Sequence, residues 1–333
     1  MADVGKSAQV SAQTVSRYFT GGYVGVETRQ RIQRAIDDLG YRHNRIARNL
    51  RASRTDTVGV LSMGPVNYGN SSILTGFSSA ARNAGISLIT THLDIDTSQP
   101  SSIDEIRHAL DAFLSFQVDG VIVGTPYLGT EKLLDYIGEA VPVVTLSDLP
   151  NRTADSASAD SYGAGFGATE HLIGLGHRAI LHVAGPANRN ESAGRLRGYQ
   201  DALAAAGLAA LPPLVSEEWT AAAGAAQGRL ADPTTFTAVF AADDLLALGF
   251  LRAMEERGLS APRDFSIIGV DDMPEVAFYS PPLTTMRLDF VELGRTALEM
   301  IVARVHSGER QQRRVITAEL QVRASTGPVT SDS

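Results

Sequence analysis

Residues 11–17 combine a hydroxyl that can cap a helix with side chains that can read DNA bases. Ser11 is placed so that its hydroxyl accepts a hydrogen bond from an N–H group in the first turn of the following helix. In that helix we expect Ala12, Gln13 and Arg17 to point outward. Glutamine can form two hydrogen bonds with adenine, arginine can do the same with guanine, and alanine packs against the thymine methyl group. These residue types predict a helix that reads bases in the major groove.

The segment before Ser11 predicts a partner for this helix. Val4 and Ala8 are four residues apart, which places them on one face of a helix, and Val15 and Phe19 form an inward face of the second helix. Two short helices joined by a tight turn are typical of a helix-turn-helix. A capped amphipathic helix is more often a structural scaffold, so a further observation is needed to separate the two interpretations.

The distribution of charge supplies that observation. The whole chain of 333 residues has a formal net charge of −8, which by itself argues against DNA binding. Residues 1–54, however, hold ten Lys and Arg against four acidic residues, a net charge of +6, whereas the remaining 279 residues carry a net charge of −14. A basic N-terminal segment on an acidic body is typical of a nucleic-acid-binding protein, so the charge favours DNA reading over a scaffold.

The elements that follow must position this pair of helices. A third helix is predicted over 27–39, with one apolar face and a glycine as its stop. The next segment, 44–54, carries an arginine at every third position: Arg45, Arg48, Arg51 and Arg54. It is too short to be a stable helix alone, so we expect it to become ordered only against a partner.

From Thr57 onward the pattern changes to alternating strands and helices. Short apolar runs predict strands at 58–61, 86–89, 120–123, 141–144, 179–183, 238–241 and 266–270. Strands that alternate with helices form parallel sheets, which bind ligands at the carboxyl ends of their strands. Seven strands spread over two halves predict two similar α/β subdomains with a cleft between them.

No set of residues predicts catalysis. The chain has no cysteine, which excludes disulfides, thiol catalysis and cysteine metal sites. The adjacent pairs 243–244 and 271–272 consist of aspartates that should point to opposite faces, so they cannot act together as acid and base. The histidines at 171, 177 and 182 lack metal-ligand spacing, and the glycines in 163–167 match no phosphate-binding motif. We predict no enzyme, metal site or cofactor. With no signal peptide or membrane-spanning run, we expect a cytoplasmic protein.

With these features placed, the chain resembles the lactose-repressor/galactose-repressor family of bacterial transcription regulators over nearly its whole length. The resemblance rests on blocks in one order at 3–17, 28–29, 39–41, 44–50, 171–178, 195–199, 241–244, 269–272 and 281–285. It implies a helix-turn-helix headpiece at 1–43, a hinge helix or linker at 44–55, and an effector-binding core at 56–325. The core is implied to be two doubly wound α/β subdomains of the periplasmic-binding-protein type, about 56–155 with 288–312 and 156–287 with 313–325. We expect a disordered tail at 326–333.

The resemblance also implies a homodimer on a roughly palindromic operator in double-stranded DNA. Major-groove contacts are implied for the recognition helix, at Ala12, Gln13, Thr14, Ser16 and Arg17. DNA contacts are also implied for the hinge, at Asn44, Arg45, Ala47, Arg48 and Leu50, with Leu50 in the minor groove and contact to phosphates left open for Arg45 and Arg48. In this family a leucine of the paired hinge helices levers the minor groove open, which is the apolar wedge of other minor-groove binders.

The same resemblance implies a small-molecule effector in the core cleft. The matching positions are Ile73, Ser147, Arg195, Trp219, Asp243, Asp271 and Phe290. Arginine and carboxylates bind adjacent hydroxyls, and an indole stacks on the apolar face of a sugar. We expect a mono- or disaccharide, a galactoside-like glycoside first, because two carboxylates outnumber one arginine. Ser147 and Gly124 stand where relatives carry Asp and Asn, so the identity of the ligand does not transfer.

Several alternatives remain open at this point. Trp219 could be a core residue instead of a ligand contact. The effector could be a purine instead of a sugar. The chain could also be a sugar-binding protein with no role on DNA, although its basic N-terminal segment argues against this. Whether the effector releases or promotes DNA binding is likewise open.

Three headpiece residues depart from the family pattern. Gln9 stands where the family has a glycine that tolerates left-handed backbone. Gly5 replaces an alanine in the first helix, at an expected cost of roughly 1 kcal/mol. His43 replaces a proline of the hinge. We therefore expect a headpiece that becomes firmer on its operator.

Overall fold

The computed structural model describes residues 1–19, 21–41, 54–95, 100–124, 127–128, 131–147 and 153–329. The chain divides into two compact units, the headpiece Met1–Thr55 and the core Asp56–Ser333. The segment 44–50, with the predicted hinge contacts Asn44, Arg45, Ala47, Arg48 and Leu50, lies outside the described residues. In the part that is described, no helix combines the length and apolar character needed to cross a membrane.

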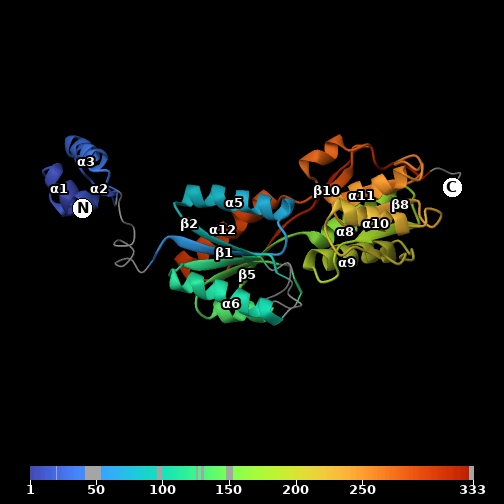
Figure 1. Cartoon of the computed structure of the whole chain (residues 1–333), viewed down its shortest axis with the longest axis horizontal. Coiled ribbons are helices and arrows are strands. Elements are labelled where there is room, and N and C mark those ends of the chain that lie inside the picture. Colours follow the sequence, from blue (N-terminus) through green and yellow to red (C-terminus); the bar gives the residue numbers. More distant parts are fainter. Residues whose placement is uncertain are drawn as a thin grey trace. The chain divides into compact units, whose positions relative to one another are not determined.

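The headpiece contains three helices, α1 (Ala2–Ser7), α2 (Ala12–Phe19) and α3 (Val26–Asp38) (Figure 1). Val4, Val15 and Ile32, one from each helix, are fully buried and form its small core. The cap is as predicted, because the backbone N–H of Thr14 donates to Ser11 Oγ at 3.1 Å. The inward face of α2 is therefore set by its apolar spacing, and its first turn by the serine.

The turn between α1 and α2 explains two of the departures from the family pattern. Gln9 has a φ of 54°, the left-handed conformation that favours glycine. Gly5 is buried, and a Cβ atom there would lie 2.8 Å from the carbonyl oxygen of Val10. The expected gain from alanine at this position is therefore wrong for this chain, because the backbone of the turn occupies the space that the methyl group would need.

Replacing Gln9 with glycine should stabilise the headpiece by about 1 kcal/mol, since glycine adopts the left-handed backbone without a Cβ clash. In the full-length chain, hydrogen exchange of the α1 and α2 amides should slow accordingly. Gln9→Ala is the matched control, because it shortens the side chain but keeps the Cβ atom. Equal protection in the glycine and alanine variants would show that the backbone conformation is not the cause.

Within its described residues the core contains two six-stranded sheets. The first has the order β11-β5-β4-β3-β1-β2, with all pairs parallel, and the second the order β12-β10-β9-β8-β6-β7, with only β12 antiparallel. The first sheet consists of β1 (Thr57–Met63), β2 (Ser87–Leu93), β3 (Gly120–Gly124), β4 (Val143–Leu146), β5 (Asp155–Ala159) and β11 (Arg314–Ile316). The second consists of β6 (Ile180–Ala184), β7 (Leu214–Val215), β8 (Ala238–Ala241), β9 (Ser266–Asp271), β10 (Thr284–Arg287) and β12 (Glu319–Gln321).

Helices cover both faces of each sheet, as the predicted alternation requires. On the first sheet α5 (Tyr68–Ala84) and α12 (Phe290–Ser307) pack on one face, and α6 (Pro100–Ser115) and α7 (Glu131–Gly138) on the other. On the second, α8 (Ser161–Gly174) and α9 (Asn190–Ala205) lie opposite α10 (Ala221–Leu230) and α11 (Asp244–Glu255). A short 3₁₀ helix, η1 (Pro274–Phe278), follows β9. The fold class is thus the predicted one.

Two subdomain boundaries in the structure differ from the predicted ones. β5 continues to Ala159 in the first sheet, beyond the predicted limit at 155. β11 pairs with β5, so residues 314–316 belong to the first subdomain and not to the second, as had been predicted for 313–325. The chain crosses between the subdomains three times, and no local pattern marks where the first crossing, after β5, or the last crossing, after β11, occurs.

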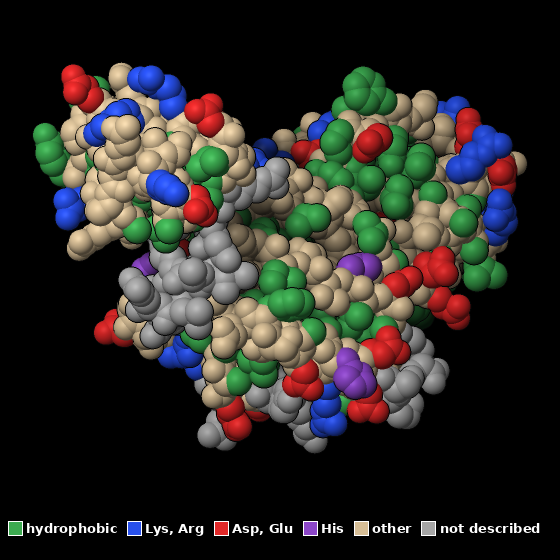
Figure 2. All heavy atoms as spheres, turned by 60° about the vertical axis from the view of Figure 1, so that its left-hand side comes forward, with side chains coloured by type: hydrophobic (Ala, Val, Ile, Leu, Met, Phe, Trp, Pro, Cys, Tyr) green, Lys and Arg blue, Asp and Glu red, His purple; other side chains and the backbone are tan. Residues whose placement is uncertain are grey.

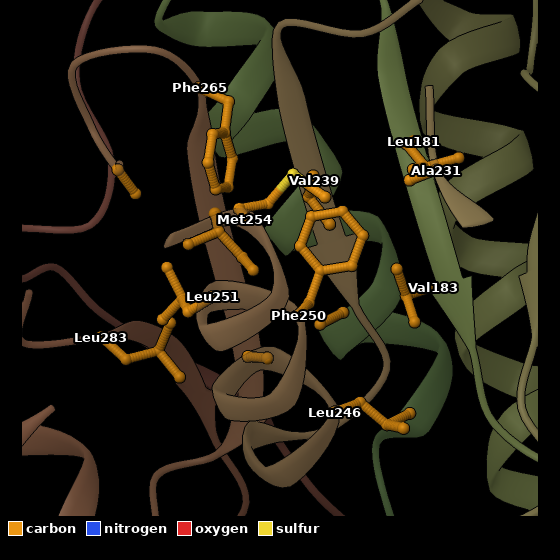
Figure 3. Packing of buried hydrophobic residues seen from close by; sticks show 14 of the residues in the cluster. Leu181, Val183, Ala231, Val239, Leu246, Phe250, Leu251, Met254, Phe265 and Leu283 are labelled. Atoms are coloured by element: carbon orange, nitrogen blue, oxygen red, sulfur yellow. The ribbon is translucent and has the colours of Figure 1, made fainter. Parts of the chain in front are cut away.

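A dense apolar core anchors the second subdomain. Phe250 and Met254 of α11 pack toward Val239 of β8 and Phe265 (Figure 3). The rings of Phe250 and Phe265 meet edge to face at 6.1 Å. This packing fixes the N-terminus of α11, where Asp243, an acidic residue of the cavity lining, lies.

The C-terminal segment is held by hydrogen bonds as far as residue 329. The Ser325 side chain accepts from the Thr284 N–H at 2.8 Å and donates to the Ile267 carbonyl at 2.6 Å. His177 Nε2 lies 3.1 Å from the Gly327 carbonyl oxygen, and the Val329 N–H donates to Leu175. The predicted disorder from 326 is therefore wrong for 326–329. The composition of this segment alone indicates disorder, but hydrogen bonds to residues distant in the sequence fix its backbone. Residues 330–333 lie outside the described residues.

Candidate functional site

A cavity of about 350 Å³ opens between the two sheets of the core. Its walls come from both subdomains, including the ends of β1, β3 and β4 on one side and the end of β9 and the start of α9 on the other. All seven residues predicted from sequence line it: Ile73, Ser147, Arg195, Trp219, Asp243, Asp271 and Phe290. The structure thus brings the predicted effector residues together, and their contact with a ligand stays a prediction.

Arg195 is the central cation of this cavity. Its side chain is buried, and its guanidinium donates to the Ala242 carbonyl at 2.5 Å and to Asp271 Oδ1 at 3.2 Å. The guanidinium also lies 5.4 Å from the centre of the Trp219 ring. Two buried donors, Arg195 Nε and Trp219 Nε1, have no hydrogen-bond partner among the described residues. Buried donors are normally paired, so these two atoms can receive oxygen atoms of a ligand.

The acidic pairs divide between the cavity and the protein interior. Asp243 and Asp271 line the cavity, whereas Asp244 accepts hydrogen bonds from the side chain of Thr285 and the backbone of Met273. Asp272 instead forms an ion pair with Arg323 at 2.6 Å. The two aspartates of each pair thus have different surroundings, and one carboxyl group of each pair lines the cavity. Strand alternation is not the reason, because Asp243 caps α11 and Asp272 follows the end of β9.

Burial changes the protonation of the two cavity aspartates. It raises the pKa of Asp243 to about 6 and the pKa of Asp271 to about 7, although the nearby charge of Arg195 lowers both. Asp271 also has a φ of 111°, a strained conformation for a residue other than glycine. Strained backbone of this kind is concentrated at ligand sites, where surrounding structure holds a side chain in place.

Trp219 both packs on the core and lines the cavity, and its contact with a ligand stays a prediction. Its ring lies against Gly185, where a Cβ atom would approach ring carbons to 2.0 Å, and it packs on the apolar core of the second subdomain. The same residue lines the cavity and is only partly buried. Phe290, at the start of α12, meets the Tyr68 ring edge to face at 6.1 Å in the same wall.

Several cavity residues were missed from sequence. Arg189, Asn190 and Glu191 line it, with Arg189 Nη2 and Glu191 Oε1 2.9 Å apart. They come directly after β6 and its loop, so their place at the carboxyl end of a parallel strand could have indicated them. Among the described residues, three carboxyl groups and two arginines line the cavity. Carboxyl groups thus still outnumber arginines, which was the reason for expecting a neutral ligand.

The recognition helix presents the predicted face. Ala12, Gln13 and Arg17 are exposed, Thr14 and Ser16 are partly buried, and Val15 is buried. Lys and Arg side chains are spread over the surface of the headpiece (Figure 2). This helix therefore presents polar side chains to solvent on one face and packs through Val15 on the other.

His177 and His182, two of the histidines considered above as metal ligands, have structural partners. His177 lies within hydrogen-bond distance of Thr237 and Ser266, and the His182 ring stacks against both Tyr199 and Phe240. Across the described residues, no group of three or more potential ligands could hold a metal ion.

Known proteins match both units. The family described as "Bacterial regulatory proteins, lacI family" matches residues 1–44, and the "Periplasmic binding protein-like domain" matches residues 169–326. The HTH-type transcriptional regulator AscG of Escherichia coli is 30% identical, with 93% of each chain covered. The HTH-type transcriptional repressor PurR of Haemophilus influenzae is also 30% identical, with 97% of each covered. The chain belongs to the lacI family. It is therefore a DNA-binding transcriptional regulator.

Solved structures of this lacI family agree with the fold. The Lac repressor dimer bound to operator and the anti-inducer ONPF superimposes with a TM-score of 0.87 at 26% identity, covering 98% of each chain. The complex of the regulator CelR with cellobiose gives a TM-score of 0.71 at 29% identity, covering 97% of this chain and 98% of that one.

Proposed function

We propose that this lacI-family protein is a homodimeric repressor of carbohydrate-utilisation genes, controlled by a mono- or disaccharide in the core cavity. The observation that carries the proposal is the pair of unpartnered buried donors, Arg195 Nε and Trp219 Nε1, beside the carboxyl groups of Asp243 and Asp271. Sugar hydroxyls both accept and donate hydrogen bonds, so they complement this mixed set, and the indole face suits the apolar side of a sugar ring.

Size and charge support the same ligand class. A volume of about 350 Å³ lies at the lower end of ordinary small-molecule sites and suits a sugar of one or two rings. The excess of carboxyl groups over arginines disfavours an anion. CelR, one of the structural relatives, is bound to the disaccharide cellobiose.

For the DNA side we propose that Ala12, Gln13, Thr14, Ser16 and Arg17 contact the operator in the major groove. The hinge residues Asn44, Arg45, Ala47 and Arg48 are proposed to follow the minor groove, with Leu50 as the wedge. This part of the proposal rests on the family resemblance and on the exposed polar face of α2.

The decisive experiment uses the single tryptophan of the chain, Trp219. A panel of sugars and purines is titrated while its emission is followed, and the binding of DNA selected from a random pool is measured at the same ligand concentrations. One sugar should shift the emission saturably and change the affinity for the selected DNA. A purine that gives the only saturable shift would overturn the sugar assignment, and a sugar that shifts emission without altering DNA affinity would separate the cavity from the regulation.

Sugar binding should strengthen as pH rises from 6 to 8. Because burial raises the pKa of Asp271 to about 7 from its ordinary 3.8, the carboxylate form proposed to accept sugar hydroxyls is the minor form at pH 6. The ionised fraction grows roughly tenfold over this range, and we expect the affinity to follow it. The folded-state pKa lies above the unfolded one, so the contribution of Asp271 to core stability falls as pH rises through about 7.

Asp271→Asn should bind weakly and without this pH dependence. Glu275→Gln, which removes an exposed carboxyl group outside the cavity lining, should retain the wild-type profile. A profile that is unchanged by Asp271→Asn would assign the titration to another group.

A further inference from the structure

The two subdomains of the core meet at a contact between Tyr127 and Arg189. Tyr127 lies between β3 and α7, and Arg189 directly precedes α9. Their backbones form an isolated antiparallel bridge, in which the Leu128 N–H donates to the Asn188 carbonyl at 3.1 Å. The Arg189 guanidinium lies 4.7 Å from the centre of the Tyr127 ring. Arg189 is 4% exposed and Tyr127 6%, so the contact is almost fully shielded from water.

Further residues of the first subdomain complete a socket around this guanidinium. Tyr127 Oη donates to the Ile95 carbonyl at 3.1 Å, which fixes the ring. Gly64, which follows β1 with a φ of 87°, lies so close that a Cβ atom there would be 2.8 Å from Arg189 Nη1 and 3.0 Å from Tyr127 Oη. Segments following β1, β2 and β3 therefore converge on one cation of the opposite subdomain, and only glycine leaves room for it.

The contact also reaches the cavity wall. Arg189 Nε and Nη2 bind Glu191 Oε1 at 3.0 and 2.9 Å, and both residues line the cavity, whereas Tyr127 and Gly64 do not. A buried guanidinium needs polar or aromatic partners, and the tyrosine ring and the glutamate supply two of them. A change at Tyr127 or Gly64 would move the Arg189–Glu191 pair without touching a ligand.

We propose that Tyr127 is a positioning residue of the effector site, which holds the Arg189–Glu191 pair at the cavity wall and keeps the two subdomains closed. The proposal rests on the proposed function in one respect, namely that this cavity is the effector site. A desolvated cation–π contact of about 2 kcal/mol shifts an equilibrium between closed and open subdomains roughly 30-fold. The apparent ligand affinity scales with the closed fraction, so loss of the ring should weaken binding from a distance.

The test compares four variants of the full-length protein. Tyr127→Leu removes the ring, and Tyr127→Phe keeps the ring while removing its hydrogen bond to Ile95. Gly64→Ala fills the socket. Gly85→Ala is its matched control, because Gly85 is also left-handed, with a φ of 69°, but has open space where the Cβ atom would lie. Far-UV circular dichroism establishes that each variant is folded.

The main readout is acrylamide quenching of Trp219, which lines the cavity and becomes accessible when the subdomains separate. Tyr127→Leu and Gly64→Ala should raise the quenching constant, whereas Tyr127→Phe and Gly85→Ala should stay near the wild type. Titration with methyl β-galactoside should show an affinity loss of up to roughly 30-fold for the first two variants only.

Two results would overturn the positioning role. One is equal quenching in the wild type, Tyr127→Leu and Gly64→Ala; the other is a rise in all four variants, which would indicate general loosening. Because quenching requires no sugar, it tests the Tyr127 contact even if methyl β-galactoside fails to bind. Failure of every sugar in the panel on the wild type would instead count against the proposed function alone.

Discussion

Replacing Arg195 with methionine is expected to weaken sugar binding by at least roughly 100-fold, or about 3 kcal/mol, the size of one or two hydrogen bonds to a charged group. Methionine fills much of the same volume but removes every donor. The Ala242 carbonyl and the Asp271 carboxyl group lose their shared partner, and the Nε donor proposed for a sugar hydroxyl disappears. The measurement is the saturable shift of Trp219 emission with the sugar that responds in the wild type.

Arg197 provides the matched control for this change. It lies two residues further along α9, is exposed, and stacks at 5.2 Å over Tyr162 outside the cavity. Arg197→Met removes the same charge from the same helix and should bind sugar like the wild type. Comparable losses in both variants would attribute the effect to net charge or helix stability, and an unchanged affinity in Arg195→Met would exclude Arg195 from the site.

Gln13→Ala is expected to weaken binding to the selected operator by roughly 10- to 100-fold, the value of one good base contact, with little change on unrelated DNA. Gln13 is exposed near the start of α2, and its amide can pair with an adenine edge. Val15 and the Ser11 cap lie on other sides of the helix, so the substitution leaves the packing of the headpiece intact. Fluorescence anisotropy with operator and scrambled duplexes separates the two affinities.

Gln30→Ala is the companion variant, since Gln30 is an exposed glutamine of the same headpiece on α3 instead of α2. It should bind operator like the wild type. A repeat of the DNA selection with Gln13→Ala should change the preferred base at particular positions. A variant that selects the wild-type consensus with full affinity would remove Gln13 from the base-reading set.

Local patterns in the sequence determined the parts of this protein whose structure depends on near neighbours. The spacing of Val4, Ala8 and Val15 and the hydroxyl of Ser11 were sufficient to predict the paired helices and their cap, because helix periodicity and capping act within four residues. Apolar runs of strand length likewise predicted seven strands of the core. The family motifs identified the seven cavity residues.

Only the tertiary structure decided what depends on contacts between distant segments. β5 consists of small and polar residues, yet Asp155 is buried by Arg304 from 149 positions further along the chain, so no apolar pattern marks this strand. β11 pairs in the first sheet because the chain stays in the first subdomain after α12 and crosses to the second only between β11 and β12. In both cases contacts with neighbouring segments stabilise the strand, and the intrinsic preference of its own residues for strand structure contributes little.

The wall of the cavity also combines features that the sequence predicted with features that only the tertiary structure decided. The family resemblance indicated Asp243 and Asp271, and the structure shows why these two line the cavity: Asp243 caps the start of α11 and Asp271 ends β9. The socket of Arg189 requires Gly64, Ile95 and Tyr127, which follow three different strands and meet only because those strands lie side by side in a parallel sheet. The residues next to Arg189 in the sequence do not indicate that the opposite subdomain buries its side chain. The surroundings of Arg189 were therefore seen only in the folded chain.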